Sequence, residues 1–390
     1  MNTPKLRFPE FSDKWQERRL EGLFSEFKSG QGITSTDITE EGNFRVFGGN
    51  GLRGYSDKYT HQGEYFLIGR QGALCGNINR ANGKVFISEH AIACKANDTS
   101  NTEWLAQRLD YLNLNRLSES SAQPGLAVNK LLRLKLITPC QSEQTKIANF
   151  LTAVDDKLTQ LKKKKSLLEQ YKKGVMQKLF SQDLRFKDDN GEDFVEWEEK
   201  RLGEICSLIT KGTTPTSVGY NFTDDGVNFI KIESLTESGV IIPNKVAYIS
   251  RQCHQALKRS QLEKDDILFS IAGALGRIGI VMSDILPANT NQALAIIRIS
   301  PESGVLVKFI AKFFVSDSIS KEIEGLKGGA AQMNLSLGQL NNLIIPIPEL
   351  PEQTKIANFL STIDEKINHC GVQIEKMEGW KKGLLQKMFV

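Results

Sequence analysis

Basic and amide side chains gather at the expected turns of this sequence, and they are the side chains best suited to a chemical role. Arginine and lysine neutralise phosphates and bind guanine edges, whereas asparagine and glutamine suit adenine, so the chemistry is contact with nucleic acid. We treat as candidate DNA-binding residues Lys28, Arg45, Asn50, Arg53, Arg70 and Gln71 in the first half, and Lys211, Thr213, Thr214, Lys231, Arg277, Asn291 and Gln292 in the second. Each type is also common on protein surfaces, so no residue is specific alone.

Motifs of the main enzyme classes are absent from the sequence. It has no G-x-x-x-x-G-K-[ST] phosphate loop and no Asn-Pro-Pro-aromatic or Asp-Pro-Pro-aromatic tetrapeptide of amino-methyltransferases. Gly273–Gly279 is followed by an expected strand rather than the helix that a dinucleotide site requires, and it is interpreted as a hairpin. Cys253 and His254 form the single adjacent Cys/His pair and are interpreted as helix packing. We expect no catalytic residue, no metal and no cofactor in this chain.

Composition indicates an ordinary globular protein. The 390 residues are 40% hydrophobic and 25% charged, which allows two or three domains. The net charge of +4 permits nucleic acid as a partner without requiring it. The six cysteines are scattered, the amino terminus has no signal-like apolar region, and no apolar run is long enough to span a membrane. A cytoplasmic protein with free thiols and no membrane partner is expected.

An internal repeat gives the strongest signal. The octapeptide QTKIANFL occupies Gln144–Leu151 and recurs 209 residues later at Gln353–Leu360. The match continues beyond the octapeptide: Asp155 recurs as Asp364, and Lys172-Lys173-Gly174 recurs as Lys381-Lys382-Gly383. Two unrelated segments would not share eight consecutive identities at the same place, so the chain contains a duplication.

Both repeat copies are predicted to be long helices. Their apolar residues recur at steps of four and three, the spacing of a coiled-coil seam. The predicted seam consists of Ile147, Leu151, Val154, Leu158 and Leu161 in the first copy and Ile356, Leu360, Ile363 and Ile367 in the second. Lys165 and Lys172 interrupt the first seam, where a lysine can extend toward solvent or limit register. A long helix with one narrow apolar stripe must bury that stripe against another element. The other repeat copy, in the same chain, is the simplest such partner.

The segments before the two helices share a framework, although their identity is low. Trp15–Leu20 resembles Trp197–Leu202, and apolar strands are expected at Tyr65–Ile68 and Ile267–Ser270. Ser100-x-x-Glu103 has the spacing of a capping box ahead of a helix. We therefore predict an α+β protein with two tandem mixed α/β domains, each followed by a long helix. The predicted boundaries are 1–143 and 182–352 for the domains and 144–181 and 353–390 for the helices.

Lys162–Lys165 is a run of four lysines inside the first helix. A solvated helix face is the simpler interpretation of such a run. A strip that faces DNA or an acidic partner is the alternative.

This layout resembles the specificity (S) subunits of type I restriction–modification systems over essentially the whole chain. QTKIANFL in each helix and the Lys-Lys-Gly-x-x-Gln-Lys-x-Phe endings carry the resemblance, with Phe47–Tyr55, Ile68–Gly72 and Asn291–Leu294. It implies two target-recognition domains that each recognise half of a bipartite site in double-stranded DNA. It implies two spacer helices packed as an antiparallel coiled coil with pseudo-twofold symmetry. The Asn291-Gln292 pair has no counterpart at Glu89-His90, so no role is transferred there.

The resemblance also implies partners. Two modification subunits would bind S-adenosylmethionine and methylate adenine, and two restriction subunits would use ATP and Mg²⁺ for translocation and cleavage. The specificity subunit itself is not catalytic. The alternatives are a coiled-coil scaffold that binds proteins but not DNA and, with less support because its motif is missing, a solitary methyltransferase.

Overall fold

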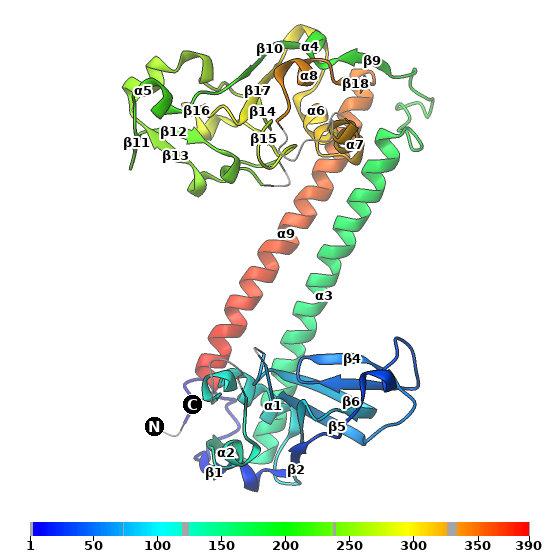
Figure 1. Ribbon diagram of the computed structural model, residues 1–390, viewed down its shortest axis with the longest axis vertical. Helices are drawn as coiled ribbons and strands as arrows, with labels where there is room; N and C mark the ends of the chain where they lie inside the picture. The colour runs from blue at the N-terminus through cyan, green and yellow to red at the C-terminus, as the bar shows by residue number, and fades with distance from the viewer. Residues whose placement is uncertain (1–2, 73, 119–124, 237–238, 326–333, 390) are drawn as a thin grey trace. The chain divides into compact units, whose positions relative to one another are not determined.

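The computed structural model describes residues 3–72, 74–118, 125–236, 239–325 and 334–389. The chain forms two compact units, of which unit 1 comprises residues 1–162 and 372–390 and unit 2 comprises residues 163–371. Each long helix is therefore divided between the units. The two helices are α3 (Gln141–Phe180) and α9 (Leu350–Met388), and each begins three residues before its predicted boundary (Figure 1).

Unit 1 is built on one six-stranded sheet in the order β2-β7-β5-β6-β3-β4. Neighbouring strands are antiparallel except for the parallel pair of β3 and β6. A separate antiparallel pair joins β1 to β8. The elements are β1 (Gln16–Arg19), β2 (Phe24–Ser29), β3 (Phe44–Gly48), β4 (Gly51–Ser56), β5 (His61–Gly69), β6 (Ile78–Ile87), β7 (Ala91–Ala96), α1 (Thr102–Tyr111), α2 (Val128–Leu132) and β8 (Lys135–Thr138).

The unit 1 sheet curls back on itself. Gly63 of β5 faces Gly83 of β6 in the ladder, and both have a positive φ (120° and 84°), which side-chain-bearing residues rarely adopt. β6 pairs with β5 from Ile78 to Val85 and with β3 from Val85 to Ile87. The curl brings the β3–β4 turn next to the end of β5, which positions the candidate site.

Unit 2 has two four-stranded sheets, in the orders β10-β17-β14-β15 and β11-β13-β12-β16, and a β9–β18 pair. Its strands are β9 (Glu198–Arg201), β10 (Cys206–Lys211), β11 (Phe222–Thr223), β12 (Val227–Ile230), β13 (Ala247–Ile249), β14 (Ile267–Ser270), β15 (Ile278–Ile280), β16 (Ala288–Thr290), β17 (Leu294–Ile299) and β18 (Ile344–Ile347). Its helices before α9 are α4 (Leu202–Ile205), α5 (Arg251–Ala256), α6 (Val307–Phe314), α7 (Asp317–Gly325) and α8 (Leu337–Asn341).

The start of each long helix shares a hydrophobic core with the end of the other. In unit 1, Ile147, Leu151 and Val154 of α3 belong to the same buried cluster as Met388 and Phe389. The unit 2 cluster contains Met176, Leu179 and Phe180 of α3 and Ile356, Ala357, Leu360 and Ile363 of α9. The predicted seam residues are buried in both copies except Ile367, which is half-buried. Packing of the apolar stripe onto a domain core explains why these long helices are stable.

One ion pair occurs once in each unit, at equivalent repeat positions. Asp155 Oδ1 lies 2.5 Å from Lys381 Nζ in unit 1, and Asp364 Oδ1 lies 2.6 Å from Lys172 Nζ in unit 2. Each repeat copy supplies the acid to one pair and the lysine to the other. The two copies are therefore complementary when they run in opposite directions, and the lysine that interrupts the seam at Lys172 has a carboxylate partner.

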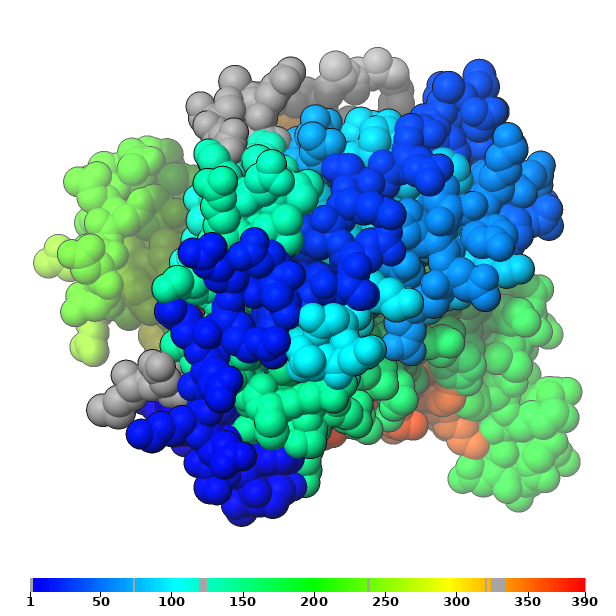
Figure 2. All heavy atoms as spheres, turned by 90° about the horizontal axis from the view of Figure 1, so that it is seen from below, coloured from blue at the N-terminus to red at the C-terminus, as the bar shows by residue number. Residues whose placement is uncertain are grey.

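A second duplication, which the sequence analysis missed, lies in the segments before the domains. Leu6-Arg7-Phe8 recurs as Leu184-Arg185-Phe186. Arg7 binds Glu143 through two hydrogen bonds of 2.7 Å, and Arg185 binds Glu352 through bonds of 3.2 and 2.8 Å. In Figure 2 the dark-blue amino-terminal segment lies against the blue-green surface near the start of α3. Each segment thus joins its domain to the first turn of the helix that follows it.

Replacing Arg7 with alanine is expected to lower the free energy of unfolding of unit 1 by about 3–5 kcal/mol, because the carboxylate of Glu143 would remain buried and unpaired. Glu143 is fully buried and the Arg7 side chain is only 12% exposed. Urea denaturation and hydrogen exchange at the start of α3 measure the effect. Arg19→Ala is the control, since Arg19 forms an exposed pair with Glu21 and should change stability by less than about 1 kcal/mol. Equal effects of the two substitutions would contradict the role of Arg7.

The cap of α1 differs from the prediction. Asn101, rather than Ser100, precedes the helix, and its side chain accepts a hydrogen bond of 2.9 Å from Trp104 N. The backbone N–H of Asn101 donates to Gln144 Oε1 at 2.9 Å. The start of α1 is therefore fixed by α3, a contact between distant residues that a local spacing rule cannot detect.

Candidate nucleic-acid interface

Four loops of unit 1 meet at one end of its curled sheet. Gly30 N, after β2, donates to Ala91 O at 3.0 Å, and Arg70 N, after β5, donates to His90 O at 2.9 Å. The β3–β4 turn lies so close that a Cβ on Gly49 would be 2.7 Å from His90 O. The ends of β2 and β5, the β3–β4 turn and the β6–β7 turn therefore form one continuous surface.

Four of the six candidate residues of unit 1 belong to this surface. Asn50 is in the β3–β4 turn, Arg53 follows it on β4, and Arg70 and Gln71 follow β5. Asn50, Arg53 and Gln71 are exposed and Arg70 is half-buried. Two guanidinium groups with two amides are a combination that can contact both phosphates and base edges.

The other two candidates of unit 1 interact with protein groups. Lys28 Nζ lies 2.8 Å from Glu26 Oε1. Glu26 also accepts a hydrogen bond of 2.8 Å from Tyr65, and burial together with this bond raises the pKa of Tyr65 to about 12. Arg45, near the start of β3, donates to Asn82 O at 3.0 Å and lies over the Phe47 ring. Arg45 is thus directed toward β6 and away from the turn that carries Asn50.

The same arrangement of loops occurs in unit 2. Gly212 N donates to Leu294 O at 3.2 Å, Thr213 N to Thr290 O at 3.0 Å, and Ile271 N to Ala293 O at 2.9 Å. These bonds bring together the end of β10, the turn between β16 and β17 and the loop after β14. β12 joins them because Ile230 pairs with Thr290 in a parallel ladder. The seven candidates of unit 2 lie on these loops or at the end of β10: Lys211, Thr213, Thr214, Lys231, Arg277, Asn291 and Gln292.

Side chains of the unit 2 loops contact one another. Thr214 Oγ1 donates to Gln292 Oε1. Lys231 Nζ lies 4.1 Å from the centre of the Phe222 ring. Arg259, which the sequence analysis did not select, donates to Thr213 Oγ1 at 3.0 Å. It reaches the site from a short 3-10 helix distant in sequence, so no local pattern could have identified it.

Backbone bonds define which loop positions correspond between the units. In unit 1, Arg70 N donates to His90 O and Gly30 N donates to Ala91 O. In unit 2, the corresponding bonds run from Ile271 N to Ala293 O and from Gly212 N to Leu294 O. By this correspondence, Asn291 and Gln292 align with Ser88 and Glu89, one position earlier than the pair compared in the sequence. The units thus share one loop framework but present different side chains on it, as expected if each recognises a different target.

No helix among the described residues is long and apolar enough to cross a membrane. In the same part of the chain, no group of three or more His, Cys, Asp or Glu residues is placed to hold a metal. Cys253 is buried, and His254 Nδ1 lies 2.5 Å from Asn289 Oδ1. These contacts agree with the interpretation of this pair as packing residues.

Comparison with known proteins gives one consistent family. The model of the family described as "Type I restriction modification DNA specificity domain" matches residues 12–170 and 194–375. A relative in Escherichia coli, the type I restriction enzyme EcoprrI specificity subunit, is 41% identical over 143 residues, which are 36% of each chain. The putative MjaX specificity subunit of Methanocaldococcus jannaschii is 30% identical over 269 residues, 67% of this chain and 60% of that one. The matched region thus spans from about a third to less than two thirds of these relatives.

A solved structure has the same fold. The S subunit of a type I restriction–modification system from Mycoplasma genitalium superposes with a TM-score of 0.68 at 20% identity. The superposition covers 100% of this chain and 99% of that one.

Proposed function

Because this chain belongs to the DNA specificity family of type I restriction–modification systems, we propose that it is a DNA-recognition subunit whose two loop surfaces each bind one half of a split site. The observation that carries the proposal is the paired loop surface. Both units bring together the same loop ends through equivalent backbone bonds, and both present basic and amide side chains there. A conserved framework with different side chains suits one protein that binds two different half-sites.

In this proposal, charged side chains contribute mainly to affinity for DNA and amide side chains contribute mainly to sequence specificity. Arg53 and Arg70 in unit 1 and Lys211, Arg259 and Arg277 in unit 2 supply positive charge for phosphates, which gives affinity but little sequence information. Asn50, Gln71 and Gln292 supply amides that can recognise base edges in the major groove. Lys28 and Arg45 are given no contact with DNA in this proposal, because each has a partner within the protein.

The long helices set the distance between the half-sites in this proposal. Within each unit, a segment of α3 and a segment of α9 share a core and an ion pair, which supports an antiparallel coiled coil. α3 has 40 residues, so its length is about 60 Å at about 1.5 Å per residue. That length suffices to place two domains one turn of duplex apart, about 34–36 Å. No role is assigned to the lysine run Lys162–Lys165, whose side chains can face solvent, DNA or a protein partner.

The family relationship supports further roles for the complex. We infer that two modification subunits dock on the helices and carry S-adenosylmethionine, and that two restriction subunits carry ATP and Mg²⁺. This chain has no catalytic role in that assembly. A protein-binding scaffold remains the competing function, and DNA binding distinguishes the two.

Arg70→Ala is expected to weaken duplex binding and to reduce by about one the slope of log affinity against log salt concentration, because one phosphate contact is lost. The measurement is retention of a random-sequence duplex, from low salt upward, by the chain assembled with its modification subunit. Arg45→Ala is the control, because Arg45 is an arginine of unit 1 whose guanidinium is bonded to Asn82 O, away from the loop surface.

Three results bear on this proposal. Loss of affinity for Arg70→Ala but not Arg45→Ala supports the loop surface. An unchanged slope together with a relaxed base preference, read from the methylated sites in cells that carry the variant, would also support it and would assign Arg70 to a base. Failure of the unaltered complex to retain duplex at low salt would favour the scaffold.

A further inference from the structure

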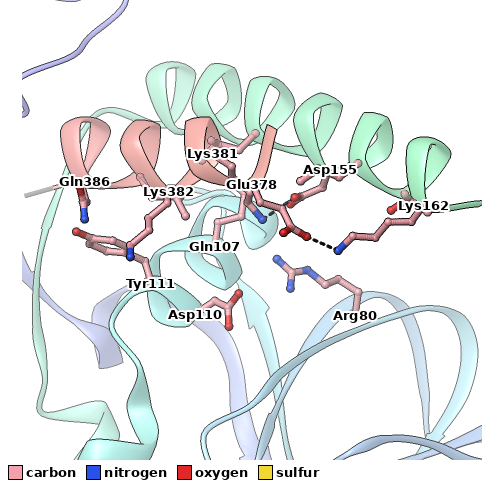
Figure 3. Close-up of a pocket in the computed structure, with 14 residues that line it drawn as sticks. Arg80, Gln107, Asp110, Tyr111, Asp155, Lys162, Glu378, Lys381, Lys382 and Gln386 are labelled. Carbon is pink, nitrogen blue, oxygen red and sulfur yellow. Dashed lines mark ion pairs between the residues drawn. The ribbon is translucent and has the colours of Figure 1, made fainter. Parts of the chain in front are cut away.

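Two carboxylates in the polar cavity of unit 1 pair with lysines of the long helices, Asp155 with Lys381 and Glu378 with Lys162 (Figure 3). Glu89 differs from them. It lies on the loop surface, in the β6–β7 turn, and forms no ion pair with a lysine or arginine among the residues that the structure describes. A carboxylate on a surface proposed to bind phosphates weakens that binding by repulsion, unless the carboxylate has a contact of its own with the DNA.

The β6–β7 turn holds Glu89 at a defined position. Ala91 N donates to Ser88 O at 3.0 Å, so Glu89 and His90 are the two corner residues of a β-turn. Glu89 N donates to Gln31 O at 3.0 Å, which fixes this turn to the loop after β2. A side chain on a backbone that is already fixed loses less conformational freedom when it binds a ligand.

The carboxylate of Glu89 has one oxygen that a ligand can reach. Oε2 is buried and accepts no hydrogen bond from a described residue. Oε1 lies 3.3 Å from Nε2 of the exposed His90, and the Glu89 side chain as a whole is 38% exposed. Oε1 is therefore the accessible atom. An ionised carboxylate oxygen only accepts hydrogen bonds, so the ligand group beside it must be a donor.

The same turn of unit 2 carries a different chemical group. Leu294 N donates to Asn291 O at 3.2 Å, which places Gln292 at the corner that Glu89 occupies in unit 1. The carbonyl oxygen of Gln292 accepts a hydrogen bond from the hydroxyl of Thr214, and its amide NH2 donates to no described residue. One corner therefore offers an acceptor and the other a donor, at equivalent positions of two surfaces proposed to bind different half-sites.

Few groups in the major groove of DNA suit a carboxylate. The amino groups of cytosine and adenine donate hydrogen bonds there, whereas guanine presents two acceptors and thymine presents an acceptor and a methyl group. The amino group of adenine lies beside the acceptor N7, which repels a carboxylate. N4 of cytosine has no such neighbour and is the better partner.

We propose that Glu89 is a specificity-determining residue, which accepts a hydrogen bond from N4 of one cytosine in the half-site bound by unit 1. This inference rests on the proposed function and assigns the base that one residue recognises. The difference between Glu89 and Gln292 at one turn position is then a source of the difference between the two half-sites.

The test measures duplex binding by the chain assembled with its modification subunit. One duplex carries the bipartite sequence that methylome mapping identifies. In the others, each C·G pair of the unit 1 half-site is replaced in turn by T·A; this half-site is the one that changes when residues 1–143 are exchanged. At one of these pairs, Glu89→Gln is expected to reduce the preference for cytosine from about tenfold to near one, because an amide can donate to O4 of thymine. The other pairs should keep their preferences.

Glu17→Gln is the matched control, since Glu17 is an exposed glutamate of unit 1 that pairs with Lys135 on the separate β1–β8 pair. It should leave every preference unchanged. Circular dichroism and the melting temperature verify that both variants fold. In the reciprocal experiment, Gln292→Glu is expected to introduce a preference for cytosine at one position of the other half-site, which the methylated sites of a host that carries the variant reveal.

A unit 1 half-site without any C·G pair would overturn the assignment of Glu89, as would a Glu89→Gln variant that keeps the full preference for cytosine at every pair. An equal gain in affinity for all duplexes, random sequences included, would also overturn it, because Glu89 would then act through its charge alone. The proposed function fails in a different way, when the unaltered complex retains no duplex at low salt.

Discussion

Exchange of residues 1–143 for the corresponding region of another specificity subunit is expected to replace one half of the recognised DNA sequence and to leave the other half unchanged. All candidate contacts of the first half-site lie within this region, in loops or on the strands beside them. Those of the second half-site lie on unit 2 loops, which form through backbone bonds of their own. Mapping methylated sites in cells that carry the hybrid measures the outcome.

The structure sets a condition on this exchange. The core of unit 1 includes Phe389, whose ring packs edge-on against Trp104 at 6.2 Å. The incoming domain must therefore keep an aromatic residue at Trp104 and the Arg7 contact with Glu143. The reciprocal exchange of residues 182–352 is the control and should replace the other half-site. A change in both half-sites from either exchange would contradict independent recognition.

Lengthening both long helices by one heptad is expected to widen the gap between the half-sites by about three base pairs without altering their sequences. Seven residues add about 10.5 Å, and the duplex rises about 3.4 Å per base pair. An insertion in α3 alone would shift this helix relative to α9, because the two helices are paired in both units through Lys172–Asp364 and Asp155–Lys381. Insertions after Lys162 and after Gly371, where the units divide, preserve both ion pairs.

The control is the α3 insertion alone, which should destabilise the protein because it shifts one set of seam residues relative to the other. Sequencing of methylated sites gives the gap directly. A matched insertion that leaves the gap unchanged would show that the helices do not set the distance.

The helices and their duplication were predictable because the signal is local and repeated. A seam of apolar residues and an octapeptide found twice are visible in any pass along the chain. Leu6-Arg7-Phe8 was missed because three residues at a different offset are too few to stand out. Its importance appears only when Arg7 and Glu143, which are 136 residues apart, are seen to bond.

The candidate residues were selected by type from the sequence, and their grouping on one surface could not be predicted from it. Asn50 and Arg70 lie on one surface because the β3–β4 turn approaches the end of β5, where a Cβ on Gly49 would be 3.6 Å from Arg70 N. No local sequence pattern predicts this long-range contact. Arg45 has the same type as Arg70, and only its bond to Asn82 O separates it from the surface. Arg259 reaches Thr213 from a segment that is too distant in sequence for any spacing rule to find.

We propose that two diverged loop surfaces bind one split DNA sequence at a distance fixed by the repeat helices. The most direct measurement is the methylome of a host that carries this chain with its modification subunit. We expect new adenine methylation in a single bipartite sequence, with two different short half-sites and a constant gap. Methylation in a continuous motif, or no new methylation from an assembled complex, would contradict it.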